Sequence, residues 1–139
     1  MQTVWDPLRQ KEVALTPEEK VRQAFIGFLR DKCRVPSGLM NSEVALEYGE
    51  KHFRADIVVF DRTGAPLVVV ECKRGDVTIG PQTVRQALRY HAVLDISYIV
   101  LTNGRTTYLY CRGEDGKFVQ LSTFPDYETM LLCRNTRNI

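Results

Sequence analysis

Apolar residues between positions 16 and 32 recur at spacings of three and four, the pattern of a helix with one buried face. Thr16 is a suitable N-cap, Pro17 suits the first helical position, and Glu19 stands three residues after the cap, as in a capping box. The segment therefore predicts an amphipathic helix.

Five further segments show the alternating or continuous apolar pattern of strands, and one more shows helical spacing. The strands are expected over residues 42–48, 52–61, 65–73, 97–104 and 106–112, and a second helix over 80–94. The order is α-β-β-β-α-β-β, in which the second helix crosses over between two strands. This order predicts a mixed α/β fold with a central mixed sheet flanked by helices.

The two ends of the chain show weaker patterns. Residues 1–15 are expected to form an extended arm, a short helix is possible near 125–133, and 134–139 are expected to be a loose tail. No internal repeat or low-complexity tract divides the chain, so residues 1–139 are expected to be one domain.

Composition narrows the functional classes only modestly. The formal net charge of +2 neither demonstrates nor excludes a nucleic-acid partner. The four cysteines form no CxxC pair and there are only two histidines, which argues against a structural zinc site. Without a signal peptide or an apolar run of roughly 20 residues, we expect a cytoplasmic protein with reduced thiols and no membrane association.

The segment VVVECKRG, residues 68–75, carries the first candidate chemistry. Its valines suit a buried strand, yet Glu71 and Lys73 stand at the end of that strand. Charged groups in such a place must be solvated, paired or functional. An ion pair on a solvated sheet edge is the structural alternative.

The neighbouring strand supplies a second carboxylate. If the hairpin is closed with Asp61 facing Pro66, residues with numbers summing to 127 lie opposite each other and share a face. The pairs expected in this register are Asp56 with Glu71 and Arg54 with Lys73.

Two carboxylates at that distance repel each other, and a divalent cation relieves the repulsion. Mg²⁺ prefers hard oxygen ligands and often binds through one or two carboxylates together with water and phosphate, and Mn²⁺ can substitute for it. Lys73 beside such an ion could orient a water molecule or stabilise phosphorane charge. The arrangement therefore predicts metal-assisted phosphodiester hydrolysis.

Asp56, followed fifteen residues later by Glu71-Cys72-Lys73, resembles the PD-(D/E)xK nuclease signature. The flanking segments LTPEEKVRQAF, RADIVVFDRTGAPLVVVECK, QALRY and IVLTNG are similar to the N-terminal nuclease domain of type I restriction enzyme R subunits, over about residues 5–112. The resemblance implies a restriction-endonuclease-like core, Mg²⁺ dependence and DNA as substrate. It implies Asp56 and Glu71 as metal ligands and Lys73 as the catalytic lysine.

The resemblance also implies roles outside this hairpin. Gln86 and Tyr90 match the QxxxY motif of the family, whereas without the family Gln86 would be a solvated residue and Tyr90 a core residue. Glu43 is either an additional metal ligand or solvent-facing, and Glu19 is either a site residue or only the capping-box glutamate. His91 is expected to be packed rather than to bind a metal.

Basic residues complete the candidate site. Five of them could contact phosphates or could simply be solvated: Lys51, Arg54, Arg74, Arg85 and Arg89.

The resemblance implies that a motor follows this domain in full R subunits, and we expect no such motor within these 139 residues. The alternative function is therefore a DNA-binding or docking module that needs a motor or specificity subunit, and a protein-interaction domain is a third possibility. The sequence leaves open whether single- or double-stranded DNA is preferred and which DNA sequence is recognised. It also leaves open the oligomeric state and a role in restriction or in repair.

Overall fold

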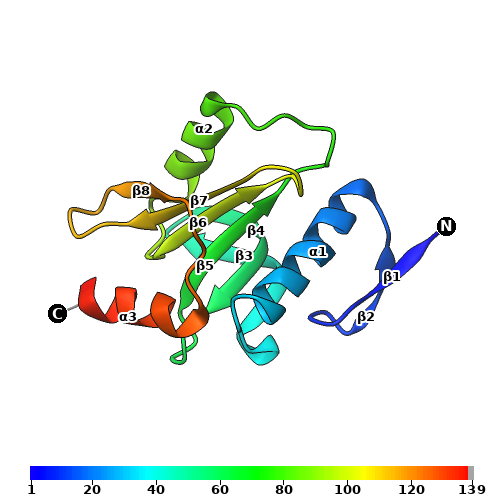
Figure 1. Cartoon of the computed structure of the whole chain (residues 1–139), viewed down its shortest axis with the longest axis horizontal. Coiled ribbons are helices and arrows are strands. Elements are labelled where there is room, and N and C mark those ends of the chain that lie inside the picture. Colours follow the sequence, from blue (N-terminus) through cyan, green and yellow to red (C-terminus); the bar gives the residue numbers. More distant parts are fainter. Residues whose placement is uncertain (138–139) are drawn as a thin grey trace.

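The computed structural model describes the backbone of residues 1–137 and the side chains as far as Cys133. Its elements are drawn in Figure 1. They are β1 (Thr3–Asp6), β2 (Lys11–Ala14), α1 (Pro17–Asp31), a 3₁₀ turn (Ser37–Leu39), β3 (Met40–Tyr48), β4 (Lys51–Phe60), β5 (Pro66–Cys72), α2 (Pro81–His91), β6 (Tyr98–Thr102), β7 (Thr107–Arg112), β8 (Phe118–Leu121) and α3 (Tyr127–Arg137).

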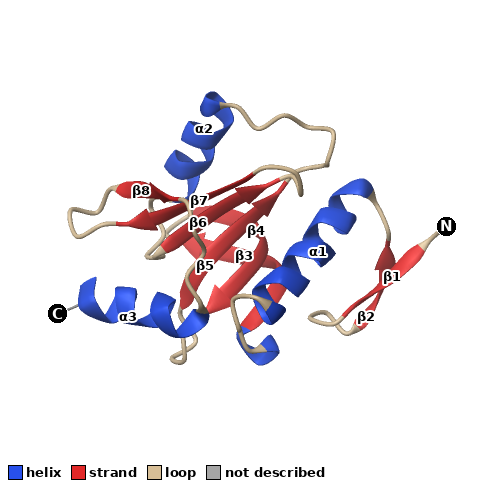
Figure 2. Cartoon of the chain, viewed as in Figure 1, coloured by secondary structure: helices blue, strands red, loops and turns tan. Residues whose placement is uncertain are grey.

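Six strands form one sheet in the order β3-β4-β5-β6-β7-β8. In the described part of the chain, β5 and β6 are the only strands that pair in parallel, and α2 makes the crossover between them. Helices α1 and α3 lie on one face of the sheet and α2 on the other (Figures 1 and 2). The predicted mixed α/β class and the order α-β-β-β-α-β-β are confirmed for the core, α1 to β7.

Helix α1 forms because it has the N-cap and the apolar face that its sequence predicts. The hydroxyl of Thr16 accepts a hydrogen bond from the backbone N–H of Glu19 at 3.1 Å, and Ile26 and Leu29 are buried against the sheet. The capping box is only half formed, because the carboxylate of Glu19 contacts Arg9 and Arg22 instead of the start of the helix.

Both ends of the chain are more ordered than we expected. Residues 3–14 form the β1–β2 hairpin, not an extended arm, because Asp6 closes the turn by accepting the N–H groups of Leu8 and Arg9. The loose-tail prediction is wrong for 134–137, where α3 continues. Residues 138–139 lie outside the described part of the chain, and β8 was not predicted.

The β4–β5 hairpin has the predicted register only in its middle. Residues with numbers summing to 127 pair from Ile57 to Val59, but an irregularity follows and Phe60 pairs with Pro66. The expected facing of Asp61 and Pro66 is therefore wrong. The ladder also ends at Ile57, so it includes neither the Asp56–Glu71 pair nor the Arg54–Lys73 pair.

A break in the β3–β4 ladder decides where the acidic side chains point. The strands pair on both sides of Glu43 and Asp56 but not at these residues, and Glu43 has a left-handed backbone with φ of 51°. Ile57 packs in the cluster that includes α1, whereas Ala55, two residues earlier, packs in the cluster on the other face. The alternation of side chains thus changes face at the break, as it does at bulges.

Candidate functional site

A cavity of about 430 Å³ lies where the end of β5 meets β4 and α2. We call it the Glu71–Lys73 cleft. Its lining residues are Arg54, Glu71, Lys73, Thr83, Gln86, Ala87 and Tyr90. The fold therefore brings together four of the five predicted catalytic residues, contributed by β5, the segment after it and α2.

Glu71 is held between two basic groups. Its carboxylate lies 3.2 Å from the amine of Lys73 and 3.8 Å from Nε2 of His91. Contact with His91 is the largest influence and lowers the pKa of Glu71; burial opposes it, and Lys73 adds to the lowering. The carboxylate is thus kept in the charged form that could bind a cation.

His91 is 1% exposed, so the prediction of a packed histidine is confirmed. Its contact with Glu71 was not anticipated, because sequence spacing alone does not show which strand residue a buried helix residue touches. Its Nδ1 has no hydrogen-bond partner among the described residues.

Asp56 does not line the Glu71–Lys73 cleft. One carboxylate oxygen accepts the backbone N–H of Cys72 at 2.7 Å, and the other lies 2.9 Å from the guanidinium of Arg22 on α1. The first bond holds the carboxylate of Asp56 at the backbone of Cys72, which is the residue after Glu71. This is the point where the β4–β5 ladder ends. The two carboxylates nevertheless have different partners, on α1 and near α2, so the expected direct facing is wrong.

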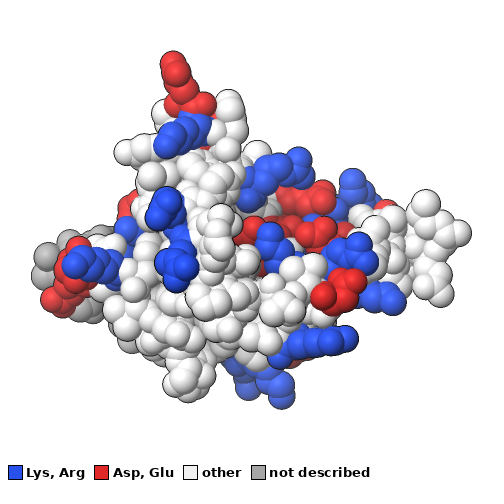
Figure 3. Space-filling model, turned by 90° about the horizontal axis from the view of Figure 1, so that it is seen from above, with Lys and Arg blue, Asp and Glu red and all other residues white. Residues whose placement is uncertain are grey.

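Arg22 belongs to a larger group of charges, here called the Arg22 cluster. Its members are Asp6, Arg9, Glu19, Arg22, Glu43 and Asp56. Four carboxylates and two guanidinium groups give a net formal charge of −2. In Figure 3, acidic and basic side chains gather toward the side of the molecule that carries β1 and β2.

The β1–β2 hairpin is attached to the domain through these charges. Arg9 contacts Asp6 and lies 2.6 Å from Glu19 and 3.0 Å from Glu43, while Ser42 donates to Asp6 at 2.8 Å. Burial raises the pKa of Asp6, but hydrogen bonds from Arg9, Ser42 and backbone N–H groups outweigh it, and the pKa is lowered.

Both secondary acidic candidates lie in this cluster. Glu19 is buried and contacts Arg9 and Arg22, each at 2.6 Å, so its role exceeds that of a capping residue. The Glu43 side chain is 41% exposed and pairs with the same two arginines, so it is not simply solvent-facing.

The two residues of the QxxxY motif both line the cleft. Tyr90 is 46% exposed, which contradicts the alternative of a core residue, and its ring packs edge-on against Phe53 with centroids 4.7 Å apart. Gln86 is exposed at the cleft one helical turn earlier.

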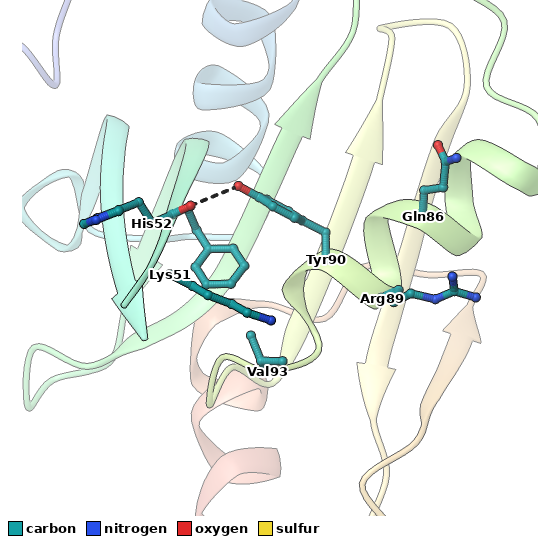
Figure 4. A pocket seen from close by; sticks show the side chains of 7 residues that line it. Lys51, His52, Gln86, Arg89, Tyr90 and Val93 are labelled. Carbon is teal, nitrogen blue, oxygen red and sulfur yellow. Dashed lines mark hydrogen bonds between the residues drawn. The ribbon is translucent and has the colours of Figure 1, made fainter. Parts of the chain in front are cut away.

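The predicted basic residues separate into three groups. Arg54 lines the cleft, whereas Lys51 and Arg89 line a neighbouring cavity (Figure 4). Arg74 pairs with Asp76 at 3.3 Å, and Arg85 is exposed on α2 and lines neither cavity.

Sequence reasoning missed Arg9 and Arg22. Arg22 stands three residues after Glu19 on α1, a spacing that predicts their contact. The contacts from Arg22 to Asp56 and from Arg9 to Glu43 join distant segments and have no local sequence pattern.

The carboxylates near the end of β5 suit a hard cation, although they do not form a complete cage. Among the described residues, no group of three or more His, Cys, Asp or Glu side chains is arranged to hold a metal ion. Mg²⁺ often takes only one or two protein carboxylates and completes its shell with water and phosphate. Asp56 and Glu71 are each partly exposed and have the oxygen ligands for such an ion, but Asp56 is paired with Arg22 and Glu71 with Lys73, so an ion held by both would have to replace these contacts.

The mixed six-stranded sheet and its flanking helices have a restriction-endonuclease-like fold. Residues 17–125 match the family model described as type I restriction enzyme R protein N terminus (HSDR_N). The match covers more than half of the chain, and the chain belongs to this family.

Solved structures show the same fold. A fragment of a candidate HsdR subunit of a type I restriction enzyme from Vibrio vulnificus YJ016 aligns with a TM-score of 0.64 and 20% identity over 90% of this chain. The chain spans only 26% of that fragment. A candidate nuclease belonging to DUF820 from Anabaena variabilis ATCC 29413 aligns with a TM-score of 0.51 and 14% identity, covering 82% of this chain and 72% of that one.

The comparison with curated proteins found no match. In the described part of the chain, none of the helices is long and apolar enough to cross a membrane.

Proposed function

We propose that this domain is a Mg²⁺-dependent deoxyribonuclease that hydrolyses phosphodiester bonds in the Glu71–Lys73 cleft. The observation that carries the proposal is the convergence of Glu71, Lys73, Gln86 and Tyr90 on one cavity. Family membership supports the same function, since the family is that of a restriction enzyme subunit.

Asp56 and Glu71 would hold the metal ion, which when bound would act as a Lewis acid on a phosphoryl oxygen. The lowered pKa of Glu71 keeps its carboxylate charged near neutral pH. Lys73 and Arg54 would place positive charge beside the scissile phosphate, where charge grows in the transition state. Gln86 would position the DNA strand through its amide, which both donates and accepts hydrogen bonds.

The alternative is a DNA-binding or docking module that cuts only with a motor or specificity subunit. The ion pair between Asp56 and Arg22 favours it, because this pair already neutralises one of the two carboxylates. This version predicts DNA binding that weakens with salt and no cutting by the isolated domain.

The test is incubation of the purified chain with plasmid and single-stranded DNA in Mg²⁺, Mn²⁺ or EDTA. We expect cutting with either metal and none in EDTA. Lys73→Ala, Asp56→Asn and Glu71→Gln should each cut at least about 100-fold more slowly, the scale on which one electrostatic group acts in catalysis.

Lys117→Ala is the matched control, because Lys117 is an exposed lysine in the β7–β8 turn and lines neither cavity. Undiminished cutting by Lys73→Ala would refute the role of that lysine. If wild type binds DNA but cuts none under any condition, the docking function replaces the nuclease function.

A further inference from the structure

A second cavity, of about 540 Å³, adjoins the Glu71–Lys73 cleft and shares Gln86 and Tyr90 with it. Figure 4 shows Tyr90 reaching from α2 toward β4, with Val93 after the helix. The cavity is lined by Lys51, His52, Phe53, Gln86, Arg89, Tyr90 and Val93. We call it the Tyr90 cavity.

The aromatic side of this cavity is packed against its neighbours and is also open to solvent. The Tyr90 ring packs edge-on against Phe53, with centroids 4.7 Å apart, and against His91 at 4.8 Å. Its hydroxyl donates to the carbonyl of His52 at 3.4 Å, which fixes its direction. Tyr90 is still 46% exposed and Val93 is 39% exposed, so this apolar surface is accessible to a planar ligand.

The charges around the cavity favour an anionic ligand. Lys51 and Arg89 line it and, among the described residues, no carboxylate does. Arg54 and Lys73 add positive charge in the adjoining cleft, where Glu71 is the acidic residue. Outside the lining, Glu47 lies 3.3 Å from Nδ1 of His52. An aromatic surface bordered by cations is the combination that binds single-stranded nucleic acid, through base stacking and phosphate contacts.

We propose that the Tyr90 cavity binds one unpaired nucleobase of a DNA strand whose adjacent phosphate occupies the Glu71–Lys73 cleft. This inference rests on the proposed nuclease function and specifies its substrate, a strand with at least one unstacked base. Bases inside a duplex present no free face to Tyr90, so they must first unpair.

The test compares the binding of two fluorescein-labelled oligomers of equal length, one of thymidines and one of abasic deoxyribose phosphates. EDTA prevents cutting, and both oligomers carry the same phosphate charge. We expect wild type to bind the oligothymidine about tenfold more tightly, within the range of one base stacked on an aromatic side chain. Tyr90→Leu should bind both oligomers equally, whereas Tyr90→Phe, which keeps the ring, should retain the preference.

Tyr48→Leu is the matched control, because Tyr48 is 58% exposed but lines neither cavity. It should keep the wild-type preference, and circular dichroism should show that all three variants are folded. Equal binding of the two oligomers by wild type, a preference retained by Tyr90→Leu, or no binding of either oligomer would each overturn the inference.

These results separate the base-binding inference from the nuclease proposal. A wild-type preference for bases without any cutting in Mg²⁺ or Mn²⁺ supports the base subsite while the nuclease proposal fails. Cutting in Mg²⁺ together with equal binding of the two oligomers supports the nuclease proposal and refutes the base subsite.

Discussion

Arg22→Ala removes a cation that three carboxylates share. The Arg22 side chain is 8% exposed and lies 2.6 Å from Glu19, 2.9 Å from Asp56 and 3.5 Å from Glu43. Without Arg22 the cluster keeps its four carboxylates and only one guanidinium group. We therefore expect the variant to fold with a clearly lower free energy of unfolding.

The size of the loss follows from which partners are buried. Removing one member of a buried ion pair costs about 3–5 kcal/mol, because the remaining charge stays buried without compensation. The lower end applies here, since Glu19 keeps Arg9 and Asp56 keeps the N–H of Cys72. The Glu43 side chain is 41% exposed, so solvent screens its interaction with Arg22 and the loss of that interaction costs little. We expect a loss of about 3 kcal/mol.

Urea denaturation followed by circular dichroism measures this loss. With a slope of about 2 kcal/mol per molar urea, the midpoint should fall by about 1.5 M. Arg30→Ala is the matched control on the same helix, since Arg30 pairs with the exposed Asp31, and its midpoint should barely move. If Arg22→Ala loses no more stability than Arg30→Ala, the ion pairs of the Arg22 cluster do not stabilise the fold.

Two further predictions concern stability. Because the pKa of Glu71 is lowered from 4.5 in the folded chain, its stabilisation is complete above that pH and disappears as pH falls through the lower folded value. The gap in melting temperature between wild type and Glu71→Gln should therefore narrow between about pH 6 and pH 3, and a constant gap would contradict this. Gly104 has a φ of 85°, so Gly104→Ala should lower the free energy of unfolding by about 1–2 kcal/mol. Gly38 has no positive φ, and Gly38→Ala should not lower it. Equal melting temperatures of the two variants would refute backbone strain at position 104.

Local patterns were sufficient for most of the sheet and for α1. Apolar periodicity located the helices and strands of the core because each element must bury one face, and Thr16 marked the start of α1. The β1–β2 hairpin was missed because short, largely exposed strands have little periodicity, and Asp6 closes its turn without glycine. Strand β8 was also missed because it has only four residues and none of them is buried.

The candidate site was predictable only in part. Glu71, Lys73, Gln86 and Tyr90 line one cleft, as an acidic-basic strand end and an i, i+4 pair on the following helix allow. The partner of Asp56 was not predictable, because the expected register assumed regular alternation along β4. The ladder break at Glu43 and Asp56 interrupts that alternation, and no sequence pattern marks it.

By itself, the sequence determined the family motif, the order of the elements and the residues with the chemistry to bind a cation and a phosphate. Those features depend on residue type and short spacing, which the chain carries locally. Only the tertiary structure decided that Arg22 binds Asp56, that His91 contacts Glu71 and that the Tyr90 ring stands open beside the cleft. These contacts join residues far apart in the chain, and packing of helices on a twisted sheet, not local preference, selects them.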